Sequence, residues 1–391
     1  MERRSDNDIN WSERTHELAQ ILHSSGIDTI ESFAWRDLAD PDAGGSEVHA
    51  DHVMTRWAEA GLSIHHRTST HDTPETFGRH GYRVTRKGGR YSVFGRVIFT
   101  RLFTRAHRST AIVEIWNGVP WFSQLWGNRV HSVWLHHIHE DMWSESLPKM
   151  LAPIARWVET SFAPLLYRRT HITTLATTTR DELISRGYRP EIVTVAEPGI
   201  DPRFVPDLSR KTQNPTLIAV GRLAPVKRFP LLLTMFSDVV THIPDAHLTI
   251  AGDGPDRETL QQLIAHLGLE NSVTLAGRVT DEELLHLYQS RWLLVSASHS
   301  EGWGMTITEA AASGTPCVVT NNHGHSAAAV QNQTGLIVDN DSEMVSAIVD
   351  LLTDNDRREL LQHGALQHAQ RFQWDRTAAL LLEALTKSIS Q

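Results

Sequence analysis

The sequence has a single cysteine, Cys317, among its 391 residues. With one cysteine no disulfide can form within the chain, so an apolar core has to hold the fold together. The sequence also lacks any run of 18 or more apolar residues, which excludes an ordinary membrane-spanning helix. Its first residues lack the apolar centre of a secretory signal. We therefore expect a cytoplasmic protein, and attachment to the inner face of the membrane stays open as an alternative.

An excess of basic charge is also lacking. The chain has 37 Lys and Arg residues against 46 Asp and Glu, which gives a formal net charge of -9. Residues 1–205 carry 24 basic and 25 acidic side chains, whereas residues 206–391 carry 13 and 21, so the acidity lies in the second half. A nucleic-acid-binding domain is expected to be broadly basic. We therefore expect no nucleic acid among the partners.

Residues 76–113 are a local exception, because they hold nine basic side chains and no acidic one. The nine are Arg79, Arg83, Arg86, Lys87, Arg90, Arg96, Arg101, Arg105 and Arg108. Between 89 and 108, apolar residues recur at near-helical spacing with arginines between them, which predicts a helix that packs one face on the core. The alternative is peripheral contact with an anionic membrane through residues 79–108.

The chain is long enough for two domains, and its second half has a clear pattern. From residue 215 onward, short continuous apolar runs bounded by Gly and Pro alternate with amphipathic segments, as in a parallel sheet covered by helices on both faces. Thr280 and Glu283 predict a capping box at one helix start. We expect strands at 215–223, 246–255, 272–279, 292–298, 316–320 and 334–339, and helices at 226–241, 256–267, 281–289, 305–313 and 341–353.

The first half shows the same alternation of segments as the second half. Strands are expected at 28–37, 62–69, 109–116, 131–137, 171–177 and 191–201, and a Pro-rich linker at 197–215. We therefore predict an α/β fold of two Rossmann-like, doubly wound domains, 1–205 and 206–372, followed by a helix at 373–391.

Two glutamates, Glu301 and Glu309, stand eight residues apart in SEGWGMTITEAAASG, around the expected start of a helix. Eight residues of helix advance about 12 Å, further than the roughly 5 to 9.5 Å between the paired carboxylates of a glycosidase. The net rotation of about 80° lets both face one elongated ligand. Gly302 and Gly304 lie between them, where free N–H groups attract phosphate. Phosphates flanked by hydroxyl groups on both sides describe a nucleotide sugar.

A second cluster points to the same ligand. In VGRLAPVKRF, Arg222 ends a strand and Lys227 follows five residues later. Two fixed cations can hold a diphosphate and neutralise the charge that grows on it as it leaves, a role that other enzymes give to a metal. We therefore expect no metal and no other cofactor. A zinc site at His137 and His139 is the alternative, and it lacks a clear third ligand.

These motifs resemble the GT-B retaining glycosyltransferases of glycosyltransferase family 4, the group 1 glycosyl transferases, over nearly the whole chain. EGWGMTITEAAASGTP is similar to the family's E-x7-E segment, GRLAPVKR to its G-R-L-x-x-x-K motif, and WLHHIHEDMW to its active-site histidine loop. AGGSEVH resembles its glycine turn, EPGID its pre-linker motif, and FQWDRTA its terminal helix. The resemblance implies a GT-B fold, two Rossmann-like domains facing across a cleft, with the helix at 373–391 packing back on the first.

Site residues follow from the resemblance position by position. The catalytic set it implies is His136, Glu301, Arg222 and Lys227, with His136 beside the donor sugar and the two cations on the diphosphate. The donor-binding set it implies is Glu309 at the ribose, the segment Gly302, Trp303, Gly304 and Met305, the base contacts Arg278 and Val279, and the turn Gly44 and Gly45. We expect acceptor contacts at Glu47, His49, Trp116 and Trp121, and core packing is the alternative for the tryptophans.

The chain departs from the family where an acidic residue is often found, since it has HGHSAAAV around His325. The function expected is retaining transfer of a sugar from a UDP- or GDP-sugar to a hydroxyl acceptor, which could be lipid-linked, a glycan or a glycoside. The alternatives are a GT-B epimerase or phosphorylase, or a non-catalytic protein that binds nucleotide sugars. A dinucleotide-dependent oxidoreductase is disfavoured, because Ile307 stands where the third glycine of G-x-G-x-x-G is required.

Overall fold

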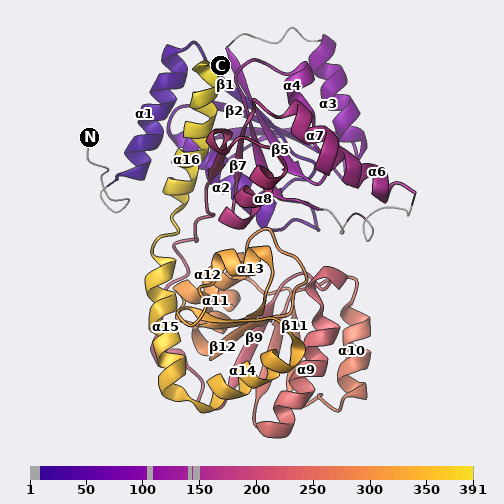
Figure 1. Cartoon of the computed structure of the whole chain (residues 1–391), viewed down its shortest axis with the longest axis vertical. Coiled ribbons are helices and arrows are strands. Elements are labelled where there is room, and N and C mark those ends of the chain that lie inside the picture. Colours follow the sequence, from indigo (N-terminus) through magenta and orange to yellow (C-terminus); the bar gives the residue numbers. More distant parts are fainter. Residues whose placement is uncertain (1–8, 104–108, 140–142, 144–149, 391) are drawn as a thin grey trace. The chain divides into compact units, whose positions relative to one another are not determined.

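The computed structural model describes residues 9–103, 109–139, 143 and 150–390. The chain divides into two compact units, one made of Met1–Gly199 with Gln373–Gln391 and the other of Ile200–Phe372. Figure 1 shows each unit as a sheet with helices around it. The first unit ends at Gly199, six residues before the boundary predicted from the sequence. Each unit is a parallel-sheet α/β domain, so the predicted fold class is confirmed.

The described strands of the N-terminal unit form one sheet in the order β3-β4-β2-β1-β5-β6-β7-β8. All neighbouring strands pair in parallel except β3 and β4, which pair as an antiparallel hairpin. The six predicted strands are confirmed, whereas this hairpin lies inside the basic stretch and was not predicted. The strands are β1 (Thr29–Phe33), β2 (Ser63–Thr68), β3 (Glu75–Arg79), β4 (Tyr82–Arg86), β5 (Thr110–Asn117), β6 (His131–His137), β7 (His171–Thr174) and β8 (Val193–Val195).

The described helices of this unit vary in length and regularity. One of them is a π-helix, Val158–Phe162, which lies between α6 and α7. The α-helices are α1 (Trp11–Ser24), α2 (Gly45–Glu59), α3 (Ser92–Phe103), α4 (Ser123–Trp126), α6 (Ala152–Trp157), α7 (Ala163–Leu166), α8 (Thr177–Ser185) and α16 (Trp374–Lys387). Helix α3 confirms the helix predicted from the apolar spacing of the basic stretch.

Helix α16 belongs to the core of the N-terminal unit, although 173 residues of the other unit precede it in the chain. Its buried Leu381, Leu382 and Leu385 join the apolar cluster that α1, α2 and the central strands form. The buried indole of Trp57 in α2 donates a 2.9 Å hydrogen bond from Nε1 to the backbone oxygen of Ala378. The apolar face of α16 therefore completes this core.

The C-terminal unit has a fully parallel sheet in its described residues, in the order β11-β10-β9-β12-β13-β14. The strands are β9 (Thr216–Val220), β10 (His247–Ala251), β11 (Val273–Gly277), β12 (Leu293–Ser296), β13 (Cys317–Thr320) and β14 (Gly335–Val338). The helices are α9 (Phe229–His242), α10 (Arg257–His266), α11 (Asp281–Ser290), α12 (Met305–Ala312), α13 (His323–Ala328), α14 (Asp341–Thr353) and α15 (Asn355–Ala369). All six strands confirm the prediction.

Local chemistry accounts for several element boundaries. At α11, the Thr280 hydroxyl accepts from the Glu283 backbone N–H at 3.2 Å, and the Glu283 carboxylate accepts from the Thr280 N–H at 2.7 Å, so the predicted capping box is present. Helix α9 begins at Phe229, three residues later than predicted, because Pro225–Lys227 form a separate 3-10 turn. In the part of the chain that the structure describes, no helix is both long and apolar enough to cross a membrane.

Candidate active site

The loops after β9 and β12 meet at the carboxyl edge of the C-terminal sheet, where ligands of such sheets bind. The backbone oxygen of Val226, in the 3-10 turn after β9, accepts a hydrogen bond from the His299 N–H at 2.9 Å. It also accepts from the Ser298 hydroxyl at 3.2 Å. These two bonds fix the turn that carries Lys227 against the loop that carries Glu301.

Lys227 and Glu301 form an ion pair between Nζ and Oε1 in this edge. Both side chains keep access to solvent, with exposed fractions of 25 % for Lys227 and 17 % for Glu301. Burial alone would raise the pKa of the Glu301 carboxyl, but the charges of Lys227 and His325 bring the pKa below its ordinary value. Glu301 is therefore an ionised hydrogen-bond acceptor, and it orients a cation that remains reachable by a ligand.

Glu301 precedes the helix, as the predicted helix bounds 305–313 imply, although the spacing argument treated the residues between the two glutamates as helical. Helix α12 begins at Met305, so Glu301 belongs to the preceding loop. The rise of about 12 Å and the rotation of about 80° calculated for continuous helix therefore do not apply. Its backbone instead contacts Gly324 in α13, where a side-chain methyl group on residue 324 would lie 2.5 Å from the Glu301 carbonyl oxygen. Glycine at 324 lets α13 approach this loop closely.

The segment around His325, where the chain departs from the family pattern, supports the Glu301 loop. His325 is 1 % exposed, and its Nδ1 lies 2.7 Å from the backbone oxygen of Thr320. Asn322 caps α13, since its side-chain oxygen accepts from the backbone N–H of Gly324 at 3.1 Å and of His325 at 3.0 Å. The capping residue Asn322 and the buried His325 thus lie in the segment where the family often has an acidic residue.

Glu309 lies within α12 and contacts a residue that the sequence analysis did not identify. Its Oε2 accepts a 3.0 Å hydrogen bond from the hydroxyl of Tyr288, which is fully buried in α11. Burial raises the pKa of Glu309 to about 7; the Tyr288 hydrogen bond opposes this rise, and the negative charges of Asp201 and Asp281 add to it. Glu309 therefore changes its charge near neutral pH.

The other residues predicted to contact the donor differ in their exposure to solvent. Arg222 directly follows Gly221, the residue after β9, and Arg278 follows β11; both side chains are exposed. Val279, Gly302 and Met305 are half-buried at the same edge, whereas Gly304 is buried at the start of α12. Trp303 is only 6 % exposed and packs edge-on against Phe372 at 5.5 Å, so its ring is a core element of this unit, and the donor contact of this segment stays a prediction.

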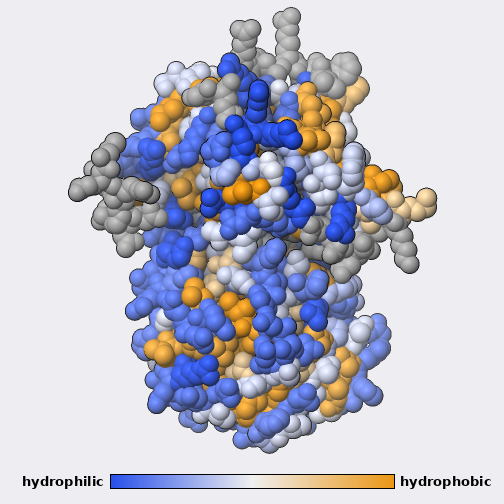
Figure 2. All heavy atoms as spheres, in the orientation of Figure 1, coloured by the Kyte–Doolittle hydropathy of each residue, from blue (hydrophilic) through white to orange (hydrophobic). Residues whose placement is uncertain are grey.

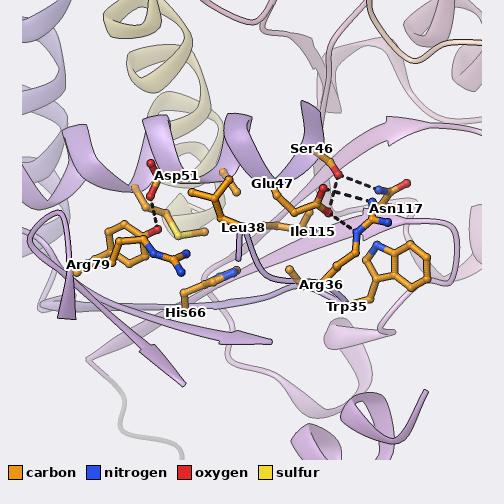
Figure 3. Close-up of a pocket in the computed structure, with 14 residues that line it drawn as sticks. Trp35, Arg36, Leu38, Ser46, Glu47, Asp51, His66, Arg79, Ile115 and Asn117 are labelled. Carbon is orange, nitrogen blue, oxygen red and sulfur yellow. Dashed lines mark hydrogen bonds and ion pairs between the residues drawn. The ribbon is translucent and has the colours of Figure 1, made fainter. Parts of the chain in front are cut away.

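The glycine turn of the N-terminal unit lies at the start of α2, with Gly44 and Gly45 exposed. Glu47 is 7 % exposed, and its carboxylate makes hydrogen bonds within the turn. It accepts from the Gly44 N–H at 2.8 Å and from the Ser46 hydroxyl at 2.8 Å. Arg36 donates to the same carboxylate at 3.2 and 3.3 Å (Figure 3). Glu47 therefore shapes the glycine turn, and its role as an acceptor contact stays a prediction.

Four further predicted residues of this unit are buried. His136, near the end of β6, is 3 % exposed, and His49 of α2 is 1 % exposed beside it. Trp116 and Trp121 are each 1 % exposed, and their indole N–H groups donate to the backbone oxygens of Gly118 and Ile115 at 2.7 and 3.1 Å. These tryptophans have no open face for a sugar ring, so the core alternative holds for them. His49 likewise faces protein and not solvent.

A buried carboxylate, Glu114 of β5, holds the loop that follows this strand. It is completely buried and accepts from the backbone N–H groups of Trp121 and Ser123 at 2.8 and 3.1 Å. The hydroxyls of Ser123 and Tyr167 donate to it at 2.6 Å each. Burial raises the pKa of Glu114, while these four donors favour its ionised form. The sequence analysis missed this residue, although a lone Glu inside the apolar run TAIVEIW was a usable signal.

A second buried carboxylate, Glu159, holds the loop after β6. It accepts from the His139 backbone N–H at 3.0 Å and from the Trp143 indole at 2.9 Å. Glu159 lies in the π-helix Val158–Phe162, an irregularity that is frequent at functional sites. Glu159 thus holds His139 and Trp143 of the histidine motif named from the sequence. Residues 140–142 and 144–149 lie outside the described part, as does the side chain of His137.

Four of the nine basic residues of this stretch form ion pairs with acidic residues from elsewhere in the chain. Arg79 and Arg86 pair with Asp37, at 2.9 and 3.5 Å, and Arg90 pairs with Asp40 at 3.2 Å. Arg101 pairs with Glu31 at 2.8 Å. Among the described basic residues of the stretch, Arg83, Lys87 and Arg96 remain exposed, while Arg105 and Arg108 lie outside the described residues.

Exposed apolar side chains accompany these cations on the same unit. Tyr91 and Phe99 are 71 % and 64 % exposed, and Ile154 and Trp157 of α6 are 58 % and 57 % exposed. Figure 2 shows hydrophobic residues gathered at the surface along the margin where Figure 1 places α3 and α6. Contact with an anionic membrane through residues 79–108 stays a prediction, and the ion pairs reduce the charge available for it.

Comparisons with known proteins agree with this architecture. Residues 202–368 match the family model described as Glycosyl transferases group 1. A D-inositol 3-phosphate glycosyltransferase of Paenarthrobacter aurescens is 33 % identical over 226 residues, 54 % of this chain and 55 % of that protein. A GDP-mannose-dependent alpha-(1-6)-phosphatidylinositol monomannoside mannosyltransferase of Mycobacterium tuberculosis is 30 % identical over 208 residues, 48 % of this chain and 54 % of that one. The chain thus matches about half the length of these curated relatives.

Solved structures extend the likeness to both units. A sucrose-phosphate synthase of Thermosynechococcus elongatus matches with a TM-score of 0.75 at 17 % identity, covering 90 % of this chain and 96 % of that one. HepE of Anabaena, in complex with UDP and glucose, matches with a TM-score of 0.70 at 18 % identity, covering 92 % and 99 %. At these identities the likeness establishes the fold. The chain therefore has the GT-B fold, and its residues 202–368 match the model of the group 1 glycosyl transferases.

Proposed function

We propose that this protein transfers a sugar from a nucleoside diphosphate sugar to a hydroxyl group of an acceptor. The observation that carries the proposal is the Lys227–Glu301 ion pair at the carboxyl edge of the family-matched sheet. A cation that is held in place and still reachable by a ligand can bind the donor diphosphate and stabilise the charge on the departing nucleotide. Arg222, exposed in the same segment that follows β9, adds a second positive charge to this edge.

One relative and one solved structure support a nucleotide sugar as the donor. The Mycobacterium tuberculosis relative is named for its use of GDP-mannose, and the Anabaena structure holds UDP and glucose. Both a UDP-sugar and a GDP-sugar are therefore candidates, and the acceptor candidates include polyol phosphates and lipid-linked glycosides. Retention of configuration at the transferred sugar and catalysis without a metal are part of the proposal, and they rest on the family resemblance and on the cations Arg222 and Lys227.

Three alternatives to a transferase remain. An epimerase would convert the nucleotide sugar without an acceptor, and a phosphorylase would use inorganic phosphate in place of the acceptor hydroxyl. A non-catalytic binding protein would bind the donor and leave it intact. Release of nucleoside diphosphate that depends on an added sugar or lipid acceptor distinguishes the transferase from all three.

The first experiment is a calorimetric titration of the purified chain with UDP, GDP and ADP in the presence of EDTA. We expect saturable 1:1 binding of UDP or GDP, because side-chain cations replace the metal at the diphosphate. The corresponding nucleoside without phosphates, titrated in parallel, should bind at least tenfold more weakly if the charges at this edge hold the diphosphate. If none of the three diphosphates binds, the proposed donor site is wrong.

Glu309 offers a second test of the donor site. If its carboxylate accepts hydrogen bonds from the two ribose hydroxyls, Glu309→Ala should weaken binding of the preferred nucleotide by roughly tenfold to a hundredfold, the range expected for one or two charge-assisted hydrogen bonds. Calorimetry of the variant with the same nucleotide measures this loss. An unchanged dissociation constant would show that the ribose assignment is incorrect.

The same residue predicts how binding depends on pH. The pKa of Glu309 is raised to about 7, so its carboxylate is mostly protonated at pH 6 and mostly ionised at pH 8. A nucleotide that binds the ionised form should therefore bind roughly five- to tenfold more tightly at pH 8 than at pH 6. Glu309→Gln is the matched control, since it keeps the shape, cannot titrate, and reports any pH dependence that comes from the nucleotide itself.

A further inference from the structure

The hydroxyl of Tyr288, near the end of α11, has Glu309 of α12 as its hydrogen-bond partner. The hydroxyl oxygen lies 3.0 Å from Oε2 of the carboxylate. Tyr288 is fully buried, and burial together with the negative charge of Glu309 raises the pKa of the tyrosine well above its ordinary value. The hydroxyl therefore keeps its proton near neutral pH, and it is the donor whenever the Glu309 carboxylate is ionised.

The two oxygens of the Glu309 carboxylate have different surroundings. Oε2 is held by Tyr288, whereas no described residue donates a hydrogen bond to Oε1. The side chain is half-buried, and Oε1 is not among the buried atoms that lack a partner. One oxygen is thus tied to the protein, and the other is open to a hydroxyl group of a ligand.

Contacts from three segments hold Tyr288 itself in place. The ring of Phe204, in the segment before β9, packs edge-on against the tyrosine ring at 5.7 Å. The hydroxyl of Thr315, just before β13, donates to the backbone oxygen of Tyr288. Gln289, the next residue of α11, donates from Nε2 to the backbone oxygen of Val205 at 2.8 Å. The donor is therefore fixed before any ligand arrives, as close packing in a protein interior implies.

The charges that act on Glu309 come from α11 and from the segment before β9. Burial is the largest cause of its raised pKa, and the negative charges of Asp201 and Asp281 add to the rise. The hydrogen bond from Tyr288 and the positive charge of Arg203 oppose it. Arg203 is shared, because it pairs with Asp201 at 2.9 Å and also with Asp281. Tyr288 is thus the direct hydrogen-bond donor that favours the ionised carboxylate.

We propose that Tyr288 is a positioning residue for Glu309. Its hydroxyl anchors Oε2, stabilises the negative charge of the carboxylate, and leaves Oε1 to accept a hydrogen bond from a hydroxyl group of a ligand. Without this anchor, the carboxylate loses both its fixed orientation and a donor to its charged form. The anchor follows from the contact alone, whereas the identification of the ligand hydroxyl as that of a ribose rests on the proposed function.

An NMR titration of the full chain tests the anchor without any nucleotide. The side-chain carboxyl carbons of glutamate are labelled with 13C, and the Glu309 signal is identified by its loss in Glu309→Gln. In Tyr288→Phe, which keeps the packed ring, we expect the midpoint of the Glu309 titration to rise by about one pH unit, because a donor to the ionised form is lost. An unchanged midpoint would overturn the proposal.

Tyr188→Phe is the matched control, because it is the same substitution at another buried tyrosine. The hydroxyl of Tyr188, in the N-terminal unit, has no hydrogen-bond partner among the residues that the structure describes. This variant should leave the Glu309 midpoint where it is in the unaltered protein. A rise of equal size in both variants would show that the Tyr288–Glu309 hydrogen bond is not its cause, and the proposal would fail.

Calorimetry with the nucleotide that binds then tests the link to the donor. For a midpoint that moves from about 7 to about 8, Tyr288→Phe should weaken binding roughly fivefold at pH 7 and less than about twofold at pH 8.5, where both carboxylates are mostly ionised. An equal loss at both pH values would indicate damage to the fold and contradict the proposal. A raised midpoint with unchanged affinity at pH 7 would leave the anchor standing and refute the ribose assignment.

Discussion

Replacing Lys227 with Ala should lower kcat for sugar transfer by 10²-fold or more, the loss expected when a charge partner of the transition state is removed. The reason lies in the position of the ammonium group, which Glu301 holds at the sheet edge while a quarter of the side chain stays exposed. As the bond to the sugar breaks, negative charge accumulates on the departing diphosphate, and the cation is already in place to stabilise it. Steady-state rates with the donor identified by calorimetry measure the effect.

Two further variants separate this role from a general loss of charge. Lys227→Met keeps the length of the aliphatic side chain and should be as defective as Lys227→Ala. Lys387→Ala removes a lysine that pairs with Glu383 in α16 at 3.0 Å, and it should leave kcat unchanged because this pair lies outside the donor edge. A kcat/KM for Lys227→Ala within about threefold of the unaltered protein would refute the assignment of the diphosphate to Lys227.

The second large effect is on stability. Glu114→Ala should reduce the free energy of unfolding of the N-terminal unit by about 4 kcal/mol or more, since each buried donor left without an acceptor costs about 1–3 kcal/mol. Four donors lose their partner: the backbone N–H groups of Trp121 and Ser123, and the hydroxyls of Ser123 and Tyr167. None of these groups gains access to water when the carboxylate is removed, because the site is fully buried.

Chemical denaturation followed by tryptophan fluorescence measures this loss, with Glu114→Gln as the conservative control. The amide keeps one acceptor oxygen and the shape of the side chain, so it should lose clearly less than Glu114→Ala. The nucleotide affinity should stay unchanged in both variants, because Lys227, Arg222 and Glu309, which are proposed to hold the nucleotide, belong to the other unit. A loss below about 1 kcal/mol for Glu114→Ala, the contribution of a single ordinary hydrogen bond, would contradict this account of the loop.

Much of the fold could be predicted because buried parallel strands leave a strong pattern in the sequence. Runs such as LIAV in β9 and CVVT in β13 are apolar on both faces, and Gly or Pro marks their ends. Strand β4 escaped prediction because it lies near the border of the sheet and alternates: Tyr82 and Val84 face inward and Arg83 faces solvent. The alternation was visible, but the density of arginines favoured a surface interpretation.

The candidate site was predicted less completely, since its geometry depends on contacts between distant segments. Spacing alone suggested that Glu301 and Lys227 serve one ligand, and the structure places them in contact. The start of α12 at Met305 agrees with the predicted helix at 305–313, whereas the distance between Glu301 and Glu309 was wrongly calculated as if both belonged to one helix. Partners supplied from far away in the chain, such as Tyr288 for Glu309, leave no signal in a short sequence window.

Aromatic and charged residues were the hardest to assign. Trp116 and Trp121 looked equally suited to a sugar-binding surface and to a core, and only the packing around them decides. The arginines of the basic stretch likewise looked available for an anionic partner until their pairing with Asp37, Asp40 and Glu31 was visible. Burial and pairing of long polar side chains are tertiary properties, so composition indicates only that such groups exist.

The place of α16 has a consequence for biosynthesis. The C-terminal unit is one continuous segment, Ile200–Phe372, whereas the N-terminal unit needs residues from both before and after it. On the ribosome, the second unit can therefore fold as soon as it emerges, while the first stays without Leu381, Leu382 and Leu385 of its core until the last helix is translated. Domains of nascent chains usually fold from the N-terminus onward. Here the C-terminal unit can be complete first, and part of the apolar surface of the N-terminal unit stays uncovered until α16 has been made.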